Sequence, residues 1–426
     1  MELFILFGSL FLLLALGVPV AFALGLSSLA TLAYLDIPLV VAFQRMAAGM
    51  NIFALMAIPF FIFAGELMNH SGIAERLVRF ANALLGRVRG GLGLVNVASS
   101  MSFGAISGSA VASASAMGSA LIPAMKKAGY DDDYAVNVTA TAATTGLLIP
   151  PSHNMIIYAI AAGGVSIGSL FLAGVVPGVL LGLALMVVAW LIAIRRGYPR
   201  GEFPGFKLVF AYFLAAVPGL LTTVIILGGI LSGIFTATES SAIAIVYTVV
   251  VARLVYRSLS FSQFVEASVA SVRTTAMVLM IIGTAAAFGW LLAVTELPQQ
   301  LSAALLTLSE NPLVILLIIN LMLLLLGTFM DMSPLIIITT PIFLPVVANL
   351  GMDPVQFGIM LILNLGLGLV TPPVGSVLFV GCAVGKIRIE KTFKSIWPFY
   401  LAFIAVLILV TYIPAVTLTL PGLFSS

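Results

Sequence analysis

The chain has 426 residues, of which 62% are hydrophobic and only 8% are charged, and its formal net charge is +3. A soluble domain carries roughly 25% charged residues, so this composition excludes an ordinary soluble protein. A bilayer accepts such a sequence because lipid covers its apolar surface. The composition therefore predicts an all-α polytopic membrane protein. The single cysteine, Cys382, excludes an internal disulfide.

Apolar segments that approach or exceed the length of a crossing, about 20 residues, follow one another along the chain. They cover residues 3–34, 50–68, 93–125, 135–163, 169–194, 208–231, 234–257, 268–295, 313–348, 357–385 and 395–425. The first run follows Met1-Glu2 without a basic region, so we interpret it as a span and not as a signal peptide. Basic residues lie in the short connections, as positive-inside topology predicts, and they form no single face for nucleic acid.

Two segments, 93–125 and 313–348, are too long for one upright crossing. They are predicted to be tilted spans or re-entrant hairpins, and in either case to be buried by protein. The first contains Ser107-Gly108-Ser109, whose small polar residues suit a hairpin turn with oxygen ligands for Na⁺. Close packing of helices through small residues is the alternative.

An internal repeat relates the two parts of the chain at an offset of 222 residues. The matched pairs are Pro123 and Pro345, Gly129 and Gly351, Asp131 and Asp353, Gly146 and Gly368, and Pro150-Pro151 and Pro372-Pro373. Upstream, the spacing from Gly104 to Pro123 is one residue longer than that from Gly327 to Pro345. Chance matching among many glycines is the alternative to a repeat.

The polar stretch at 195–207 divides the chain into a first repeat, 1–207, and a second, 208–426. Each is expected to hold scaffold helices, a hairpin (about 93–125 and 313–348) and a broken helix (about 135–163 and 357–385). An odd number of crossings in the first repeat would make the two repeats inverted, which is the usual design of secondary transporters.

The first Pro-Pro pair, Pro150-Pro151, interrupts an apolar segment. Proline removes a backbone donor and disfavours the helical conformation of the residue before it, so the helix is expected to unwind there. Carbonyl groups of Gly146 and Ile149 are then free to bind a cation. A new helix N-terminus near Ser152 can face an anion.

The second half repeats this arrangement, with Gly368 and Thr371 before Pro372-Pro373. Thr371 adds a hydroxyl group to the possible cation ligands. A merely kinked structural helix at each position is the alternative.

Three acidic residues within apolar surroundings have different expected roles. Asp331 lies inside an apolar run, where a carboxylate is costly and is a functional candidate by default. Its partner is Na⁺, a proton, or backbone amides at a hairpin turn. Glu239 follows Thr236 and Thr238 and is expected to cap a helix start. Glu66, near the end of a span, is expected to be structural.

The chain has only two histidines, His70 and His153, which are too few for a typical metal site. His153 follows the first Pro-Pro pair and either contacts an anionic substrate or simply lines the break. No zinc-protease, serine-hydrolase or P-loop motif occurs, so the sequence predicts neither an enzyme nor ATP hydrolysis.

Several motifs resemble the large membrane subunit of TRAP (tripartite ATP-independent periplasmic) transporters, and the resemblance covers nearly the whole chain. The motifs are AIPFF at 57–61, AGELM at 64–68, GAISGSA at 104–110, the IP-to-GYD region at 122–131, LIPPS at 148–152, LFLAG at 170–174, PG at 177–178 and GIFTATE at 233–239. After Pro-Pro-Ser many members carry Ile, whereas this chain has His153-Asn154, a difference that bears on substrate choice.

The resemblance implies Na⁺ symport of an organic acid by an elevator mechanism, in which a mobile domain slides against a scaffold. It implies an extracytoplasmic binding protein and a small membrane subunit of about four helices, which is expected to be a separate protein here. The candidate residues are Ser107, Ser109, Gly146 and Ile149 for one Na⁺ site, Gly327, Thr328, Gly368 and Thr371 for a symmetric second, and Ser152, His153 and Asn154 for the substrate.

The leading interpretation is thus a Na⁺-coupled symporter subunit of the bacterial inner membrane, with no organic cofactor. Its substrate is a carboxylate such as a C4-dicarboxylate, sialic acid or another sugar acid. A proton-coupled transporter using Asp331 is the first alternative. A channel would need a long polar stripe, and no predicted span in this sequence has one. An intramembrane enzyme would need a nucleophile–base pair or metal ligands, and the small number of histidines argues against both.

Overall fold

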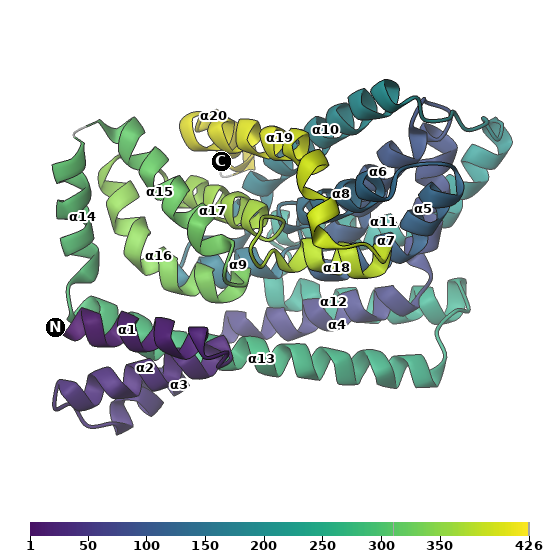
Figure 1. Ribbon diagram of the computed structural model, residues 1–426. Helices are drawn as coiled ribbons and strands as arrows, with labels where there is room; N and C mark the ends of the chain where they lie inside the picture. Colours follow the sequence, from purple (N-terminus) through teal and green to yellow (C-terminus); the bar gives the residue numbers. More distant parts are fainter. Residues whose placement is uncertain (310, 425–426) are drawn as a thin grey trace.

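The computed structural model describes residues 1–309 and 311–424, and within them the named elements are all helices (Figure 1). Seven of the described helices are long and apolar enough to cross a membrane. They are α4 with its preceding 3-10 turn (Phe53–His70), α10 (Ile167–Arg196), α11 (Phe206–Leu231), α12 with its following π turn (Ala237–Val255), α13 (Phe261–Val294), α16 (Met332–Asn349) and α19 (Phe393–Tyr412). The predicted all-helical membrane architecture is confirmed.

The helices form two layers, which lie one above the other in Figure 1. In the first layer α4 packs against α12 and α13, and α11 packs against α12. The helices α2 and α3 pack against α13, and α1 packs against α2. The second layer contains the helices on either side of the two Pro-Pro pairs, with α10 and α19 packed on them. The remaining bounds are α1 Glu2–Ala15, α2 Val20–Tyr34, α3 Val40–Met50, α5 Ile73–Leu85, α6 Gly91–Ser107, α7 Ala110–Lys127, α8 Asp132–Ala143, α9 His153–Ala161, α14 Leu297–Leu308, α15 Pro312–Gly327, α17 Pro354–Gly368, α18 Ser376–Gly385 and α20 Ala415–Phe424.

Neither of the two long segments is a single tilted span. The first is the pair α6–α7 and the second is the pair α15–α16. Ser109 Oγ accepts a hydrogen bond from Ala112 N, and Asp331 Oδ1 accepts one from Met332 N, so a side chain caps each second helix. Ala110 and Met332 begin α7 and α16 at the 222-residue offset. The one-residue difference between the halves therefore lies in the turns.

The chain leaves the helical conformation at both Pro-Pro pairs. In the first half α8 ends at Ala143, a 3-10 turn covers Thr144–Leu147, and α9 begins at His153. In the second half α17 ends at Gly368 and α18 begins at Ser376. Each broken helix thus consists of two helical segments that are joined by irregular backbone.

The two halves interlock, because the helix after each break packs on the other half's hairpin: α9 on α16, and α18 on α7. Tyr158 of α9 donates a hydrogen bond to the Pro354 carbonyl (2.5 Å). Lys126 of α7 donates one from Nζ to the Gly385 carbonyl at the end of α18 (2.6 Å). These contacts join segments that are roughly 200 or more residues apart.

A pair of matched hydrogen bonds connects the broken helices to α10 and α19. The Tyr134 hydroxyl donates to the Ala189 carbonyl (2.9 Å), and Gln356 Nε2 donates to the Thr411 carbonyl (3.0 Å). Both donors and acceptors are related by the same 222-residue offset. The same hydrogen bond is therefore made in each half, although the donor is a tyrosine in the first half and a glutamine in the second.

Replacing Lys126 by Met is expected to destabilise the protein. Lys126 neutralises the negative end of α18 and also lies 3.0 Å from Asp132 Oδ1. Because the side chain is partly exposed, the expected loss is about 1 kcal/mol. The midpoint of thermal unfolding in detergent measures it, and the adjacent exposed Lys127→Met is the control. Equal midpoints for the two variants would contradict the role of this contact.

Candidate functional site

A cavity of about 710 Å³ separates α4 and α13 from the hairpin turns and the start of α9. It therefore lies between the two layers and is lined by residues from both halves of the chain. Its polar lining residues are Glu66, Asn69, His70, Ser107, Ser109, Ser115, Ser119, His153, Thr274, Asp331 and Ser333.

The cavity contains acidic but no permanently basic side chains. Glu66 and Asp331 line it, and none of its lining residues in the described chain is Lys or Arg. Two like charges about 4 Å apart repel by roughly 4 kcal/mol near a protein surface. The walls by themselves therefore disfavour an organic anion, and cations can reverse that preference.

The first candidate Na⁺ site lies where the α6–α7 turn meets the break after α8. A Cβ atom built on Gly104 would lie 2.6 Å from the Gly146 Cα atom, so the two backbones touch. One built on Gly108 would lie 3.2 Å from the Pro151 carbonyl oxygen and 3.3 Å from His153 Nδ1. The structure thus brings the turn that holds Ser107 and Ser109 against the break.

Ile149 is placed differently from the other three residues of this candidate site. A Cβ atom built on Gly178 of α10 would lie 2.6 Å from Ile149 Cγ1, so the Ile149 side chain packs against α10. Only the backbone of Ile149 is therefore a candidate ligand.

The second candidate site has the same backbone contact. A Cβ atom on Gly368 would lie 2.6–2.7 Å from backbone atoms of Gly327. The Thr328 carbonyl accepts a hydrogen bond from Val374 N (3.1 Å), so α15 is joined to the chain beyond the break. The Thr371 hydroxyl donates to a helix carbonyl, Leu367 O (2.7 Å), which leaves its oxygen lone pairs available to a cation.

The three candidate substrate residues have separate environments. His153 lines the cavity. Ser152 is fully buried, and its Oγ atom has no hydrogen-bond partner within the described chain. Asn154 instead accepts a hydrogen bond from Ser333 Oγ (3.3 Å) and so connects α9 to α16. Of the three, His153 is therefore the one placed to contact a molecule in the cavity.

Asp331 lines the cavity and caps α16 through Met332 N (3.0 Å), so it has both a structural contact and access to a ligand. Glu239 lies elsewhere. Its Oε2 atom accepts a hydrogen bond from Thr236 N (2.8 Å), and the Thr236 hydroxyl accepts one from Glu239 N (3.2 Å). The predicted helix cap at Glu239 is confirmed.

Sequence reasoning missed the polar face of α4. Glu66, Asn69 and His70 all line the cavity, although Glu66 was expected to be structural and His70 was assigned no role. Asn69 and His70 follow Glu66 by three and four residues, a spacing that places all three on one side of a helix. This spacing was the sequence signal from which a shared polar face could have been predicted. Asn69 Nδ2 donates to Glu66 Oε2 (3.4 Å), while Asn69 Oδ1 is buried and lacks a partner in the described chain.

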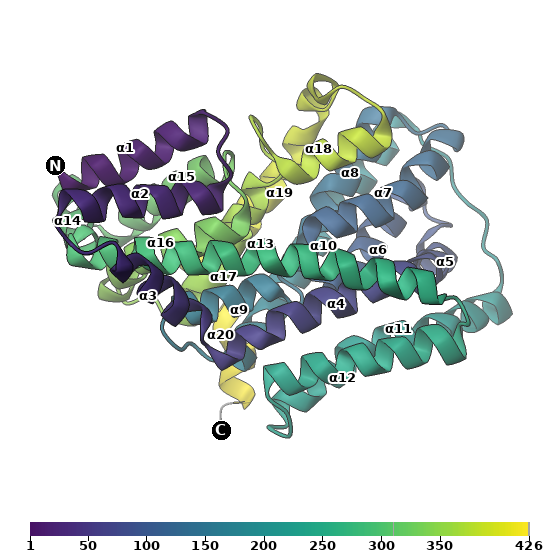
Figure 2. The same cartoon turned by 90° about the horizontal axis from the view of Figure 1, so that it is seen from below.

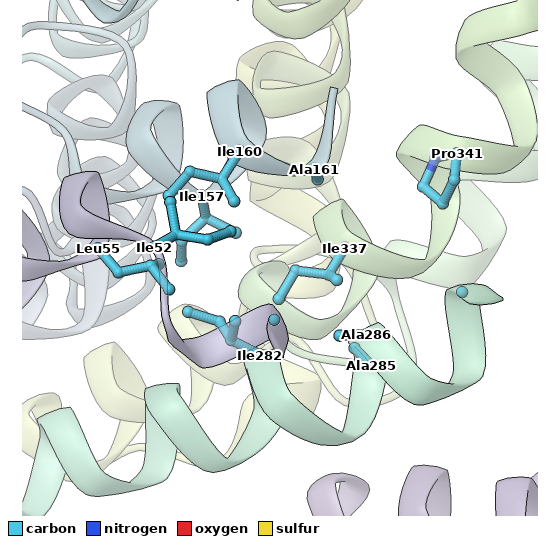
Figure 3. A pocket seen from close by; sticks show the side chains of 12 residues that line it. Ile52, Leu55, Ile157, Ile160, Ala161, Ile282, Ala285, Ala286, Ile337 and Pro341 are labelled. Carbon is cyan, nitrogen blue, oxygen red and sulfur yellow. The ribbon is translucent and has the colours of Figure 1, made fainter. Parts of the chain in front are cut away.

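A second cavity, of about 240 Å³, has an apolar lining (Figure 3). Ile157 and Ile160 of α9, Ile282 of α13 and Ile337 of α16 converge on it. It offers an organic acid no charged or hydroxyl-bearing side chain. The polar cavity is therefore the candidate site for such a substrate.

Replacing Gly368 by Ala is expected to destabilise the second break, because the new methyl group would overlap the backbone of Gly327. Overpacking of this kind costs about 1–3 kcal/mol. The control is Gly366→Ala in the same helix, where the nearest atom would be at an ordinary 3.5 Å. Thermal unfolding in detergent compares the two, and a Gly368→Ala midpoint at or above that of the control would refute the close contact.

Comparison with known proteins gives the family context. The family model described as "Tripartite ATP-independent periplasmic transporter, DctM component" matches residues 7–416. The sialic acid TRAP transporter large permease protein SiaM of Vibrio cholerae is 42% identical over 419 residues, covering 98% of each chain. The C4-dicarboxylate TRAP transporter large permease protein DctM of Rhodobacter capsulatus is 38% identical over 437 aligned positions, covering 99% of each.

Among solved structures, the Neisseria gonorrhoeae protein MtrF, described as illuminating a class of antimetabolite efflux pumps, superposes with a TM-score of 0.61 at 15% identity. The match covers 87% of this chain and 83% of that one. At this identity the similarity concerns the fold alone, which is that of a membrane transporter.

Proposed function

The chain belongs to the DctM family of tripartite ATP-independent periplasmic (TRAP) transporters, and we propose that it couples the import of an organic acid to Na⁺. Its relatives are transporter permease subunits and not enzymes. With seven apolar helices among the described residues, it is a multi-pass protein of the bacterial inner membrane.

The main support for cation coupling is the charge of the polar cavity. Glu66 and Asp331 repel a carboxylate, and no basic side chain lines the cavity to offset them. Bound Na⁺ supplies the missing positive charge. Each Na⁺ that enters with the membrane potential adds about 2.3 kcal/mol per 100 mV, so two ions would strongly drive uptake of a monocarboxylate.

We assign one Na⁺ to each break. The ligands proposed for the first ion are Ser107, Ser109, Gly146 and Ile149, and those for the second are Gly327, Thr328, Gly368 and Thr371. Carbonyl and hydroxyl oxygens suit a small hard cation, and the glycine contact at each break is the common feature that supports both assignments. Ion binding would also fix each hairpin turn against its break. Because residues of these turns line the cavity, occupancy of the Na⁺ sites would change the shape of the cavity.

The proposed substrate is a carboxylate such as a C4-dicarboxylate, sialic acid or another sugar acid, in line with the names of the relatives. It would lie near His153, with Ser152 and Asn154 behind it. The start of α9 adds the partial positive charge of a helix N-terminus.

An elevator movement of two inverted repeats would give alternating access. The interlocked hairpins and broken helices form one candidate moving body, and α4 and α11–α13 form the candidate scaffold. The cavity extends along α4 from Ile62 to His70, about 12 Å at 1.5 Å per residue. It thus reaches the end of α4 that precedes the basic connections, which positive-inside topology assigns to the cytoplasm.

The remaining two components of the transporter follow from the family. We propose a small four-helix membrane subunit that packs against this chain and an extracytoplasmic binding protein that delivers the substrate. Neither role requires a nucleic acid or an organic cofactor.

Uptake of labelled organic acids into liposomes tests the proposal. The vesicles contain this chain and its small subunit, with the binding protein outside, and an inward Na⁺ gradient is present or absent. Accumulation that requires both the gradient and the binding protein is expected. Accumulation that is indifferent to Na⁺ contradicts Na⁺ coupling, and flux that never exceeds equilibrium indicates a channel.

Replacing Asp331 by Asn separates Na⁺ coupling from proton coupling. Asn keeps the ability to cap α16 while losing the titratable group. Na⁺-dependent uptake with unchanged ion stoichiometry is therefore expected, because the proposed Na⁺ ligands are intact and Glu66 still makes the cavity negative. Asp353→Asn at the start of α17 is the control. Loss of coupling in the Asp331 variant alone, together with stimulation of the native protein by a proton gradient, would favour the proton-coupled alternative.

A further inference from the structure

A small cavity of about 250 Å³ lies between α5 and α11, apart from the 710 Å³ polar cavity of the candidate site. Its lining residues are Glu75, Arg76, Arg79, Tyr212 and Ala215. None of them belongs to the candidate site for Na⁺ or substrate. This cavity is therefore separate from the proposed transport site.

Two contacts fix the position of Arg76. Its guanidinium carbon lies 3.8 Å from the centroid of the Tyr256 ring, and its Nη1 atom donates to the Gly72 carbonyl (2.9 Å). The Tyr256 hydroxyl in turn donates to the Ala215 carbonyl on α11 (2.7 Å). Arg76 is thus a preorganised positive group at the wall of the cavity.

Arg79 and Glu75 are less constrained. They form an ion pair of 3.8 Å, with 65% and 72% of their side chains exposed. An exposed pair of this kind contributes little stability, so either partner is free to bind a further charged group. The cavity therefore offers two guanidinium groups and one carboxylate, a combination that matches a ligand with both a negative and a positive group.

The surroundings place the cavity at a membrane surface. Tyr212 lies six residues into α11, about 9 Å along the helix from its start, which is near the depth of the lipid headgroup region. The apolar side chains Phe210, Phe213 and Leu214 of α11 are exposed around it. Figure 2 shows α5 at the same end of the molecule as the starts of α11 and α13.

The same end of the molecule carries many basic residues. They include Arg87, Arg89, Arg195, Arg196, Arg200, Lys207, Arg253 and Arg257 in or beside the connections at this end. Positive-inside topology assigns it to the cytoplasmic leaflet. A phosphate group there would meet Arg76 and Arg79 at the depth where phospholipid headgroups lie.

We propose that this cavity binds the headgroup of a phospholipid that carries a primary ammonium group, as phosphatidylethanolamine does. The phosphate accepts hydrogen bonds from Arg79 and Arg76, because guanidinium groups match the geometry of phosphate oxygens. The ammonium group pairs with Glu75. The acyl chains extend along Phe213 and Leu214. A soluble phosphate ester shares the headgroup chemistry but gains nothing from these apolar side chains.

Lipid retention tests the assignment. The protein is reconstituted with equal parts of phosphatidylethanolamine, phosphatidylcholine and phosphatidylglycerol, re-extracted in mild detergent, and its bound lipid is identified by native mass spectrometry. The native chain is expected to retain phosphatidylethanolamine preferentially. Arg79→Met is expected to lower total retention about five-fold, which corresponds to roughly 1 kcal/mol for one basic residue at a membrane surface.

Two further variants make the test specific. Glu75→Gln is expected to keep lipid but lose the preference for phosphatidylethanolamine over the other two lipids. Arg195→Met removes an exposed charge at the same end of the molecule and is expected to change nothing. Retention that is equal in the native chain and the Arg79 variant overturns the proposal. Displacement of lipid by soluble glycerophosphoethanolamine at equal affinity also overturns it, because the site would then recognise a soluble ester. Neither outcome depends on which substrate the transporter carries.

Discussion

Backbone that leaves the helical conformation within a bilayer must be covered by protein, because lipid offers it no hydrogen-bond partner. The chain meets this requirement twice, after α8 and after α17. At each break the end of a hairpin helix comes into backbone contact, Gly104 with Gly146 and Gly327 with Gly368. These glycines are therefore needed because they let the two backbones come close together, and not because they make the chain flexible. Without them each break would lose the protein that covers it.

The same constraint explains why the halves interlock. A short helix after a break, such as α9 or α18, cannot bury itself against its own broken partner alone. Each packs on the hairpin of the other half. Ser333 Oγ of α16 donates a hydrogen bond to Asn154 of α9, and Lys126 Nζ of α7 donates one to the Gly385 carbonyl of α18. A displacement of one hairpin would consequently carry the other half's broken helix with it. This coupling supports movement of the whole assembly as one body, as the elevator proposal requires.

The backbone architecture could be predicted from local sequence because proline and glycine act locally. The Pro-Pro pairs predicted the positions of both breaks, and the small polar residues predicted the position of the first hairpin turn. The sequence could not show that α9 meets α16, since a contact between segments almost 200 residues apart leaves no local pattern. It also left Glu66 and His70 outside the site, because each had an ordinary local explanation near a helix end. Only the packing of α4 against the hairpin turn shows that they face the same cavity as His153 and Asp331.

The two halves are alike in backbone and unlike in chemistry. Ser109 of the first hairpin corresponds to Asp331 of the second, and both cap a helix. His153 at the start of α9 corresponds to Gly375 beside α18, which has no side chain to offer a substrate. A symmetric pair of breaks suits two cations of the same kind, because neutral backbone and hydroxyl oxygens recur in each. An organic acid, by contrast, has distinct ends and needs distinct groups. Ser109, Asp331 and His153, which differ from their equivalents in the other half, all line the cavity, so the halves are chemically distinct where a substrate would bind.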